Sequence, residues 1–277
     1  MNIGVVGLGL IGASLAKAIT DYTEHKVYGY NRTKEVMETA LQEKSICGVL
    51  DEDKLAECDI VFVSVYPGAA IDYVKQNAGR FKKNSLVIDC CGVKRILCDE
   101  LFSVADDNGF YFVGGHPMAG LAHSGMEYST SELFRGSSMI LTPQKSQKQA
   151  IKWTEKLFYQ IGFGRVVYTT PREHDEEIAY TSQLCHLVSN AFIMSDASLK
   201  HSGFSAGSFR DLTRVAWLNE NMWTELFMLN KDCLITELSS LIDRLNNYND
   251  ALCKDDYEKL RLLLRQGRER KEEVSKI

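Results

Sequence analysis

A single histidine, His116, stands in a run of small residues, Gly114-Gly115-His116-Pro117-Met118-Ala119-Gly120. An imidazole can accept or donate a proton near neutral pH, which makes histidine a common acid or base in enzymes. Glycines on both sides let the backbone or a ligand approach the ring closely, and the fixed φ of Pro117 stiffens the chain that follows. The run therefore predicts a histidine presented to a ligand. The alternative is a turn in which the histidine caps a strand.

A second motif is the glycine run Gly7-Leu8-Gly9-Leu10-Ile11-Gly12, which follows the apolar residues 3–6. Between a strand and a helix, Gly7 allows a tight turn, Gly9 lets the backbone reach a pyrophosphate, and Gly12 lets the helix pack on the strand. The first amides of such a helix can donate to phosphate oxygens. The motif predicts a dinucleotide site, and the alternative is a turn without a ligand. The predicted cofactor-binding residues here are Gly7, Gly9, Leu10, Ile11 and Gly12.

The residues after the second apolar run, 27–30, bear on which dinucleotide binds. An NAD enzyme usually has Asp or Glu here, because a carboxylate accepts hydrogen bonds from the ribose hydroxyls. This chain has Asn31-Arg32-Thr33, in which Asn31 and Thr33 can donate to a 2′-phosphate and Arg32 can pair with its charge. The run favours NADP as the cofactor. The alternative is that Arg32 is only a solvated charge and that NAD can bind with Asn31 at this position.

The elements that must position these residues change in kind along the chain. As far as about Val167, short β-branched runs alternate with helical patterns, which predicts a doubly wound, mostly parallel sheet of the Rossmann type. After Pro171 apolar residues recur every three or four positions, which predicts helices only. We expect a dinucleotide-binding domain at 1–170 and an all-helical substrate and dimerisation domain at 171–277. The predicted strands are residues 3–6, 27–30, 60–65, 86–89, 110–114, 139–142 and 164–167.

Residues 221–264 contain no proline and no glycine, so they are expected to form one long helix or two closely joined helices. The charged tail, residues 265–276, is expected to fray or to end a helix in solvent. The apolar face from Leu226 to Leu241 is larger than one small bundle needs. We therefore expect a homodimer with the active site in a cleft between domains.

Composition narrows the classes of protein. The 277 residues are 45% hydrophobic with a net charge of −5, which favours a soluble globular protein and argues against nucleic acid or an anionic membrane as partner. The apolar start lacks a basic region and is broken by glycines, so neither a signal peptide nor a membrane span is expected. The eight cysteines show no metal-ligand spacing, which indicates reduced thiols of a cytoplasmic protein without a metal site.

Further motifs accompany His116 and the glycine run. They are Leu133-Phe134-Arg135-Gly136, Ile140-Leu141-Thr142-Pro143, His174-Asp175, and Asp211-Leu212-Thr213-Arg214-Val215-Ala216 followed by Met222-Trp223. With these motifs the chain resembles the prephenate/arogenate dehydrogenase family of tyrosine biosynthesis, from Asn2 to about Asn230. The resemblance implies an oxidative decarboxylation. Hydride would leave C4 of prephenate for the nicotinamide, the C4 hydroxyl would become a carbonyl, and loss of the ring carboxylate would give 4-hydroxyphenylpyruvate and CO2.

The same resemblance implies site residues. His116 matches the catalytic histidine that accepts a hydrogen bond or proton from the hydroxyl, and Arg214 matches the arginine whose planar fork holds a substrate carboxylate. His186 matches the second of two family histidines and is expected on the substrate side, with a core-facing histidine as the alternative. Arg210 would offer a second positive charge. Lys94 matches a family lysine near the cofactor, and the alternative is a solvated lysine.

One position departs from the family pattern. Where the family often carries a serine that supports the catalytic histidine, the run Asp89-Cys90-Cys91-Gly92-Val93-Lys94 has Gly92. Either a backbone donor or a water replaces the serine, or His116 works with less support. Cys90 and Cys91 point to opposite faces of a strand and lack a base at a defined spacing, so they are expected to be buried structural thiols.

The sequence also bears on the substrate. Arogenate carries an ammonium group where prephenate carries a keto group, so a nearby carboxylate would favour arogenate. Leu218-Asn219-Glu220 stands where family members often have Ser-Asp-Pro, which puts the neutral Asn219 at the acidic position. Asn219 is therefore a predicted substrate-binding residue, and its lack of charge favours prephenate as the substrate. Arogenate is the alternative, because Glu220 could supply the charge.

Two other classes of protein compete with this hypothesis. A hydroxyacid dehydrogenase or imine reductase typically depends on a lysine in its helical half, and here Lys200 and Lys231 lie in no recognisable motif. A non-catalytic NADP-sensing protein could keep the same fold. The presence of both His116 and Arg214 argues against that reading.

Overall fold

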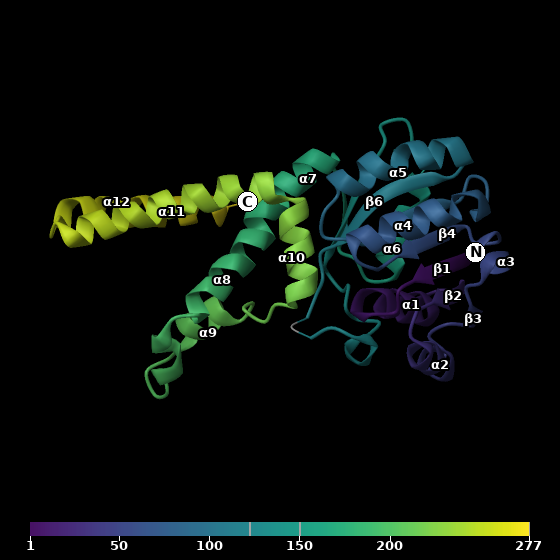
Figure 1. Ribbon diagram of the computed structural model, residues 1–277, viewed down its shortest axis with the longest axis horizontal. Coiled ribbons are helices and arrows are strands. Elements are labelled where there is room, and N and C mark those ends of the chain that lie inside the picture. The colour runs from purple at the N-terminus through teal and green to yellow at the C-terminus, as the bar shows by residue number, and fades with distance from the viewer. Residues whose placement is uncertain (122, 150, 277) are drawn as a thin grey trace. The chain divides into compact units, whose positions relative to one another are not determined.

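The computed structural model describes residues 1–121, 123–149 and 151–276 (Figure 1). Two compact units divide the chain, Met1–Asn230 and Lys231–Ile277. The change from strands to helices falls between Tyr168, where the last strand ends, and Pro171, where the next helix begins, but the first unit continues through the helices up to Asn230. The predicted domain division at residue 170 stays a prediction.

In the described residues, eight strands form one sheet in the order β3-β2-β1-β4-β5-β6-β7-β8. Strands β1 to β6 are mutually parallel, β7 runs antiparallel to β6, and β8 is parallel to β7. The Rossmann-type fold is confirmed, and all seven predicted strands are present; the two-residue strand β3 was missed. The strands are β1 (Asn2–Val6), β2 (Lys26–Tyr30), β3 (Gly48–Val49), β4 (Ile60–Val63), β5 (Leu86–Asp89), β6 (Tyr111–Pro117), β7 (Ser138–Pro143) and β8 (Arg165–Tyr168).

The central strands are buried on both faces because helices cover the sheet from two sides. Along β4, Ile60 and Phe62 belong to one apolar cluster, and Val61 and Val63 belong to the other. Successive strand residues point to opposite faces, so two separate cores form. The first cluster takes in helices α1 (Leu10–Tyr22) and α6 (Glu155–Gln160), and the second takes in α4 (Pro67–Asn77) and α5 (Arg95–Asn108) (Figure 1).

The helical part of the first unit begins with a strong local signal. The side chain of Thr170 accepts a hydrogen bond from the backbone of Glu173, the side chain of Glu173 accepts one from the backbone of Thr170, and Pro171 is the first helical residue. A π-helical turn, Ala179–Leu184, then joins two helices. The remaining helices of this unit are α2 (Lys34–Gln42), α3 (Glu52–Leu55), α7 (Pro171–Ile178), α8 (Cys185–Ile193), α9 (Gly207–Thr213) and α10 (Glu220–Leu229).

The prediction of one long helix or two closely joined helices over residues 221–264 was wrong. Three helices occupy this region: α10 ends at Leu229, α11 spans Lys231–Cys253, and α12 spans Tyr257–Val274. Asp255 adopts a left-handed φ of 50°, and the side chain of Asp256 accepts a hydrogen bond from the backbone N–H of Lys259 at the start of α12. Aspartate can thus break and restart a helix without proline or glycine.

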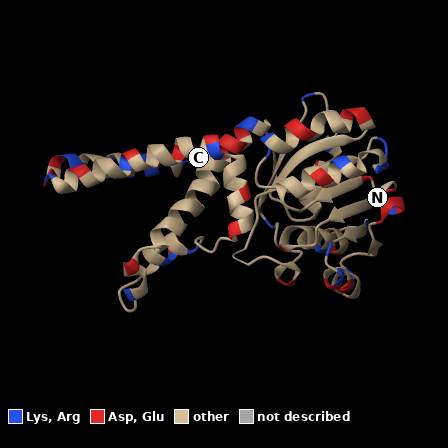
Figure 2. Cartoon of the chain, in the orientation of Figure 1, with Lys and Arg blue, Asp and Glu red and all other residues tan. Residues whose placement is uncertain are grey.

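The charged tail forms the second half of α12, which contains no buried residue. It ends a helix in solvent, one of the two predicted outcomes. Both acidic and basic residues occur along this helix and on the helices that cover the sheet (Figure 2). No helix in the described ranges is long and apolar enough to cross a membrane.

Candidate active site

The loop after β1 contains three glycines, Gly7, Gly9 and Gly12, and a side chain would have a different effect at each position. Gly7 has a φ of +85°, and a Cβ there would lie 2.5 Å from the carbonyl oxygen of Ser64. A Cβ on Gly12 would lie 1.8 Å from the carbonyl oxygen of Gly7. Gly9 is exposed, and a Cβ there would meet nothing within 4 Å. Packing therefore requires Gly7 and Gly12, whereas Gly9 leaves open space beside the helix.

That open space lies at the N-terminus of α1. No side chain caps this helix and its first turn carries no acidic residue, so the amides of Leu10 and Ile11 and the positive end of the helix dipole remain available. The loop also lies where the strand order reverses, between β1 and β4, which is where doubly wound sheets bind ligands. These residues fit the pyrophosphate of a dinucleotide.

Asn31 is tied to the same loop. Its Oδ1 atom accepts a hydrogen bond from the backbone N–H of Leu8 at 3.1 Å, and its Nδ2 lies 3.5 Å from the carbonyl oxygen of Thr33. Arg32 and Thr33 are exposed. The structure thus brings the predicted cofactor residues after β1 and after β2 together. The oxygen of Asn31 is therefore engaged, and one amide hydrogen is directed at Thr33, which leaves the second amide hydrogen as a donor.

His116 lies within β6 rather than in a turn, opposite Ile140 of β7. Close approach of the backbone, one of the two predicted reasons for its neighbouring glycines, holds for Gly115, whereas a side chain approaches Gly114. A Cβ on Gly114 would lie 2.3 Å from Oγ1 of Thr142, and one on Gly115 would lie 2.5 Å from the carbonyl oxygen of Asp89. Both glycines are therefore required by the protein's own packing around the strand.

His116 has a buried partner that the sequence analysis missed. Its Nδ1 atom lies 2.9 Å from Nε2 of His174, and Nδ1 of His174 lies 2.8 Å from Oδ1 of Asp175. His174 and Asp175 are 2% and 1% exposed. Burial, with the nearby His174 and Lys94, lowers the pKa of His116 well below its usual value of 6.5. The ring of His116 is therefore neutral at physiological pH.

Asp175 anchors this chain of hydrogen bonds at the start of α5. Its carboxylate accepts from the backbone N–H of Lys94 at 2.7 Å, from the backbone N–H of Arg95 at 3.0 Å and from Nε of Arg95 at 3.2 Å. Although burial favours the neutral acid, the hydrogen bonds from His174 and from these backbone groups lower the pKa of Asp175. Asp175 is therefore an anion that accepts every one of these bonds.

A second network lies beneath the strand of His116. Lys94 is fully buried, and its ammonium donates to Oδ2 of Asp89 and, at 2.6 Å, to the carbonyl oxygen of Gly115. Burial opposes this charge, but the carboxylate of Asp89 raises the pKa of Lys94. The solvated alternative for Lys94 was wrong. Its side chain has no exposed surface from which to touch a cofactor, and it supports the strand that carries His116.

Gly92 occupies the position at which the family often has a serine, and the side chain of Leu226 lies beside it. A Cβ on Gly92 would lie 3.5 Å from the side chain of Leu226 and 4.0 Å from Cε1 of His116. A side chain at this position would therefore face the ring, and Leu226 occupies that side instead. Neither of the two alternatives foresaw that His116 receives its support from His174.

Of the two thiols next to Gly92, Cys91 is buried, as expected, and Cys90 is partly buried. Burial raises the pKa of Cys90 to about 12 and the pKa of Cys91 well above its usual value. The Sγ atom of Cys91 lies 3.2 Å from the carbonyl oxygen of Val65. Both side chains are neutral thiols, which are poor nucleophiles.

His186 lies on α8, just after the π-helical turn. Its Nδ1–H donates to the carbonyl oxygen of Ser182 at 2.9 Å, and its ring lies 4.1 Å from that of Trp223. Burial lowers the pKa of His186, and the charge of Arg214 contributes to the lowering. The structure therefore brings His186, Trp223 and Arg214 close to one another.

Helix α10 connects this cluster with the surroundings of His116. Trp223 contacts His186, and Leu226, one turn later on the same face, contacts the Gly92 position beside His116. Glu225 accepts a hydrogen bond from the backbone N–H of Gly68, at the start of α4, at 2.8 Å. Helix α10 thus packs on the edge of the sheet where the parallel strands end. No contact among the described residues joins Arg210 or Arg214 directly to His116.

The two arginines lie at the exposed end of α9. Arg210 and Arg214 are four residues apart, so they share a face of that turn, and neither forms an ion pair with a described residue. Their guanidinium groups are therefore available to an external carboxylate. Asn219 is exposed and caps α10, since its Oδ1 accepts from the backbone N–H of Met222 at 3.0 Å. Helix capping alone accounts for an Asn at this position, and its role toward substrate stays a prediction.

Buried amides hold the helical part in place. The side chain of Asn230 donates to the backbone carbonyl of Asp175 at 2.8 Å and to Oε1 of Gln183 at 2.9 Å, and its oxygen accepts from Nη2 of Arg95 at 2.8 Å. Gln183 also donates to the backbone carbonyl of Leu226 at 3.3 Å. Gln183 stands where the family's first histidine is expected, and here it cross-links helices.

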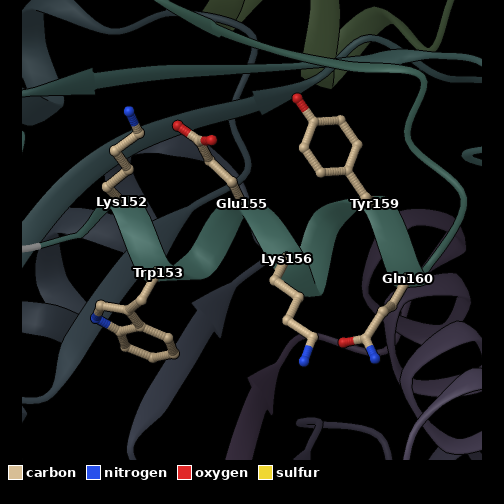
Figure 3. Close-up of a pocket in the computed structure, with 6 residues that line it drawn as sticks. All are labelled: Lys152, Trp153, Glu155, Lys156, Tyr159 and Gln160. Carbon is tan, nitrogen blue, oxygen red and sulfur yellow. The ribbon is translucent and has the colours of Figure 1, made fainter.

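The surface hollow over Lys152–Gln160 is unrelated to these motifs. Figure 3 shows Lys152, Glu155 and Tyr159 on one side of the helix, and Trp153, Lys156 and Gln160 on the other. Because the side chains diverge, they do not converge on a ligand. Among the described residues no group of three His, Cys, Asp or Glu side chains could hold a metal ion.

Comparison with known proteins agrees with these observations. Two protein-family models match the chain. The family model of the prephenate dehydrogenase nucleotide-binding domain matches residues 15–168, and the family model of the prephenate dehydrogenase dimerization domain matches residues 170–266. Cyclohexadienyl dehydrogenase of Zymomonas mobilis is 31% identical over 267 residues, covering 92% of this chain and 89% of that protein.

Solved structures give the same result. Prephenate dehydrogenase from Aquifex aeolicus, in complex with hydroxyphenyl propionate and NAD+, is 27% identical with a TM-score of 0.83, covering 99% of this chain and 98% of that one. Arogenate dehydrogenase of Synechocystis is 25% identical with a TM-score of 0.82, covering 99% of this chain and 100% of that one. The chain therefore belongs to the prephenate dehydrogenase family of nicotinamide-dependent oxidoreductases.

Proposed function

We propose that this protein oxidises and decarboxylates prephenate to 4-hydroxyphenylpyruvate and CO2. The observation that carries the proposal is the state of His116, a neutral imidazole at the carboxyl end of β6. Its Nδ1 atom is held by His174, and its Nε2 atom has no hydrogen-bond partner among the described residues. A neutral imidazole with one open nitrogen can act as a general base for a hydroxyl.

In the proposed reaction His116 takes the proton of the C4 hydroxyl as hydride leaves C4, so that a carbonyl forms. When bound, the nicotinamide supplies the hydride acceptor. As the C–C bond to the ring carboxylate breaks, its electron pair moves through the ring to the same oxygen. That oxygen then takes back the proton held by His116, and CO2 departs. One NAD(P)H is formed for each molecule of substrate.

The other residues of the site bind and orient. Gly9 and the first amides of α1 would hold the pyrophosphate of the cofactor. Arg214, with Arg210 beside it, would pair with a carboxylate of the substrate, since a guanidinium fork donates two parallel hydrogen bonds to a carboxylate. The ring of His186, held against Trp223, would line the same end of the substrate.

We infer that NADP is preferred over NAD. The loop after β2 has no carboxylate to accept from ribose hydroxyls, and the oxygen of Asn31 is occupied by Leu8. The donors that remain, on Asn31, Arg32 and Thr33, suit a 2′-phosphate. Replacement of Arg32 by Ala should raise the Kd for NADPH and leave the Kd for NADH nearly unchanged, and equal effects on both would contradict the inference.

We infer prephenate rather than arogenate as the substrate, because the neutral Asn219 stands at the position where a carboxylate would pair with an ammonium group. The test is one assay of turnover that crosses both substrates with both cofactors. The expected result is the highest kcat/KM for prephenate with NADP. A strong preference for arogenate would overturn the substrate assignment, and no turnover of either substrate would overturn the proposed function.

We also propose a homodimer formed through the second unit. Large apolar side chains on its two helices are exposed, among them Ile235 at 59%, Leu245 at 57% and Leu264 at 59%. We infer that a second copy of this chain covers these side chains. The mass in solution, measured by light scattering, should be twice that of the chain, and the mass of a single chain would contradict the proposal.

A further inference from the structure

His174 and Asp175 are buried polar residues that the proposed proton transfer does not use directly. They lie at adjacent positions on α7, whereas His116 lies on β6, 58 residues from His174. A buried polar pair is costly unless it is fully hydrogen-bonded, and this pair is bonded to the one ring that the reaction needs. The arrangement has consequences for where the proton sits on His116.

The positions of the protons follow from the chemistry of Asp175. Its carboxylate is ionised, so it can only accept, and Nδ1 of His174 must donate to it. Burial lowers the pKa of His174, so that ring is neutral and its Nε2 carries a lone pair. This lone pair accepts from Nδ1 of His116. His116 therefore carries its proton on Nδ1 and its lone pair on Nε2.

The alternative tautomer would disable the base. If Nδ1 of His116 carried the lone pair, two lone pairs would face each other across 2.9 Å, and Nε2 would present a proton to the substrate hydroxyl. The same chain of bonds also serves the charged state. Once His116 has taken a proton, its positive charge faces a ring whose far nitrogen is bonded to an anion.

We propose that His174 is a positioning residue that fixes the tautomer and orientation of His116, with Asp175 as its anchor. This inference rests on the proposed function. It also accounts for Gly92, because a side chain at that position is dispensable when His116 is held from its other nitrogen. Leu226 then occupies the space beside Gly92 next to the ring.

The test compares two substitutions at one position. In His174→Phe the ring remains but the acceptor is lost, whereas in His174→Gln the side-chain oxygen can still accept from Nδ1 of His116. The matched control is His25→Gln, a histidine near the N-terminus that contacts neither ligand site. Each variant is assayed for kcat and KM with prephenate, for the Kd of NADPH and for its circular dichroism.

His174→Phe is expected to lower kcat about 10- to 100-fold, with small changes in KM and in the Kd of NADPH. His174→Gln is expected to recover most of that loss, and His25→Gln to leave kcat unchanged. A merely structural role would not predict this recovery. If both His174 variants keep the kcat of the native protein, or if both lose it equally while folded and binding NADPH, the inference is overturned.

A second measurement works even if His174 variants fail to fold or if the native protein does not act on prephenate. The nitrogen chemical shifts of His116, measured by NMR on the native protein near neutral pH and assigned with His116→Asn, report which nitrogen carries the proton. We expect the proton on Nδ1. A proton on Nε2 would overturn the inference, independently of the outcome of the assays that test the proposed function.

Discussion

Two parts of the candidate site differ in how they are held. On the side of the base, His116, His174, Asp175, Lys94 and Asp89 form continuous hydrogen bonds, and all but His116 are buried. On the side of the proposed carboxylate-binding residues, helix α9 has no buried residue, and apolar side chains of neighbouring segments are exposed, with Leu199 86%, Phe204 93% and Trp217 79% exposed.

The difference teaches that the proposed base is oriented in advance, whereas the arginines proposed to bind the substrate carboxylate stay exposed until a ligand orders them. A base that is already oriented avoids reorganisation during the reaction. Charges that stay hydrated until the substrate arrives avoid the cost of being buried without a partner. Substitutions on the first side should therefore affect kcat and stability, and substitutions on the second side should affect binding.

The largest effect is expected at the base itself. In His116→Asn the side chain can still hydrogen-bond but cannot take a proton, so kcat should fall by about 100- to 10,000-fold. The Kd for NADPH, measured by fluorescence titration, should stay nearly unchanged because the glycine loop is intact. A variant that keeps a tenth or more of the native kcat would show that another group removes the proton.

The support beneath the base should appear in stability. Lys94→Met leaves the Asp89 carboxylate buried without its partner, which should lower the free energy of unfolding in urea by about 3–5 kcal/mol. The control is Lys75→Met, which removes the exposed ion pair with Glu100 and should cost at most about 1 kcal/mol. Equal losses in the two variants would mean that Lys94 is no more important to the fold than a surface lysine.

On the exposed side, Arg214→Ala should remove a charged hydrogen bond to substrate worth about 1.5–3 kcal/mol, or roughly 10- to 150-fold in kcat/KM. The loss should appear mainly in KM, and the unfolding free energy should not change because Arg214 is exposed. Arg268→Ala, on α12, is the matched control and should change neither KM nor the unfolding free energy. A loss of stability comparable to that of Lys94→Met would erase the distinction between the two sides.

The smallest effect concerns pH. Only neutral His116 can take a proton, and burial together with His174 and Lys94 lowers its pKa well below 6.5. As pH falls, kcat/KM should therefore stay constant through 6.5 and decline only below it. A profile measured between about pH 5 and 8 checks this. A decline with its midpoint at or above 6.5 would show that the base is not held in its neutral form.

Local signals in the sequence predicted much of this molecule. The seven strands follow from β-branched runs, and the cofactor loop follows from glycines between a strand and a helix. His116 was found through its run of small residues, although those residues are small because Thr142 and Asp89 pack against them. The role of His116 as a base stays a prediction, and the small residues beside it are explained by packing within the protein.

The partners of His116 could not be predicted in the same way. His174 and Asp175 were visible as a motif, but no spacing rule relates them to a strand 58 residues earlier. The burial of Lys94 and the helix end at Asn230 could not be predicted for the same reason. Both depend on groups that elements distant in the sequence supply. Polar residues acquire their roles from tertiary packing, whereas strands and turns follow from neighbours in the chain.

The carboxylate of Asp175 has a consequence for hydrogen exchange. The first amides of a helix usually exchange quickly with solvent, because no carbonyl within the helix accepts their hydrogens. At the start of α5, however, the N–H groups of Lys94 and Arg95 donate to buried Asp175. Their exchange with deuterium should be slow and should require α5 and α7 to separate, so these two amides report directly on how often the support of the base opens.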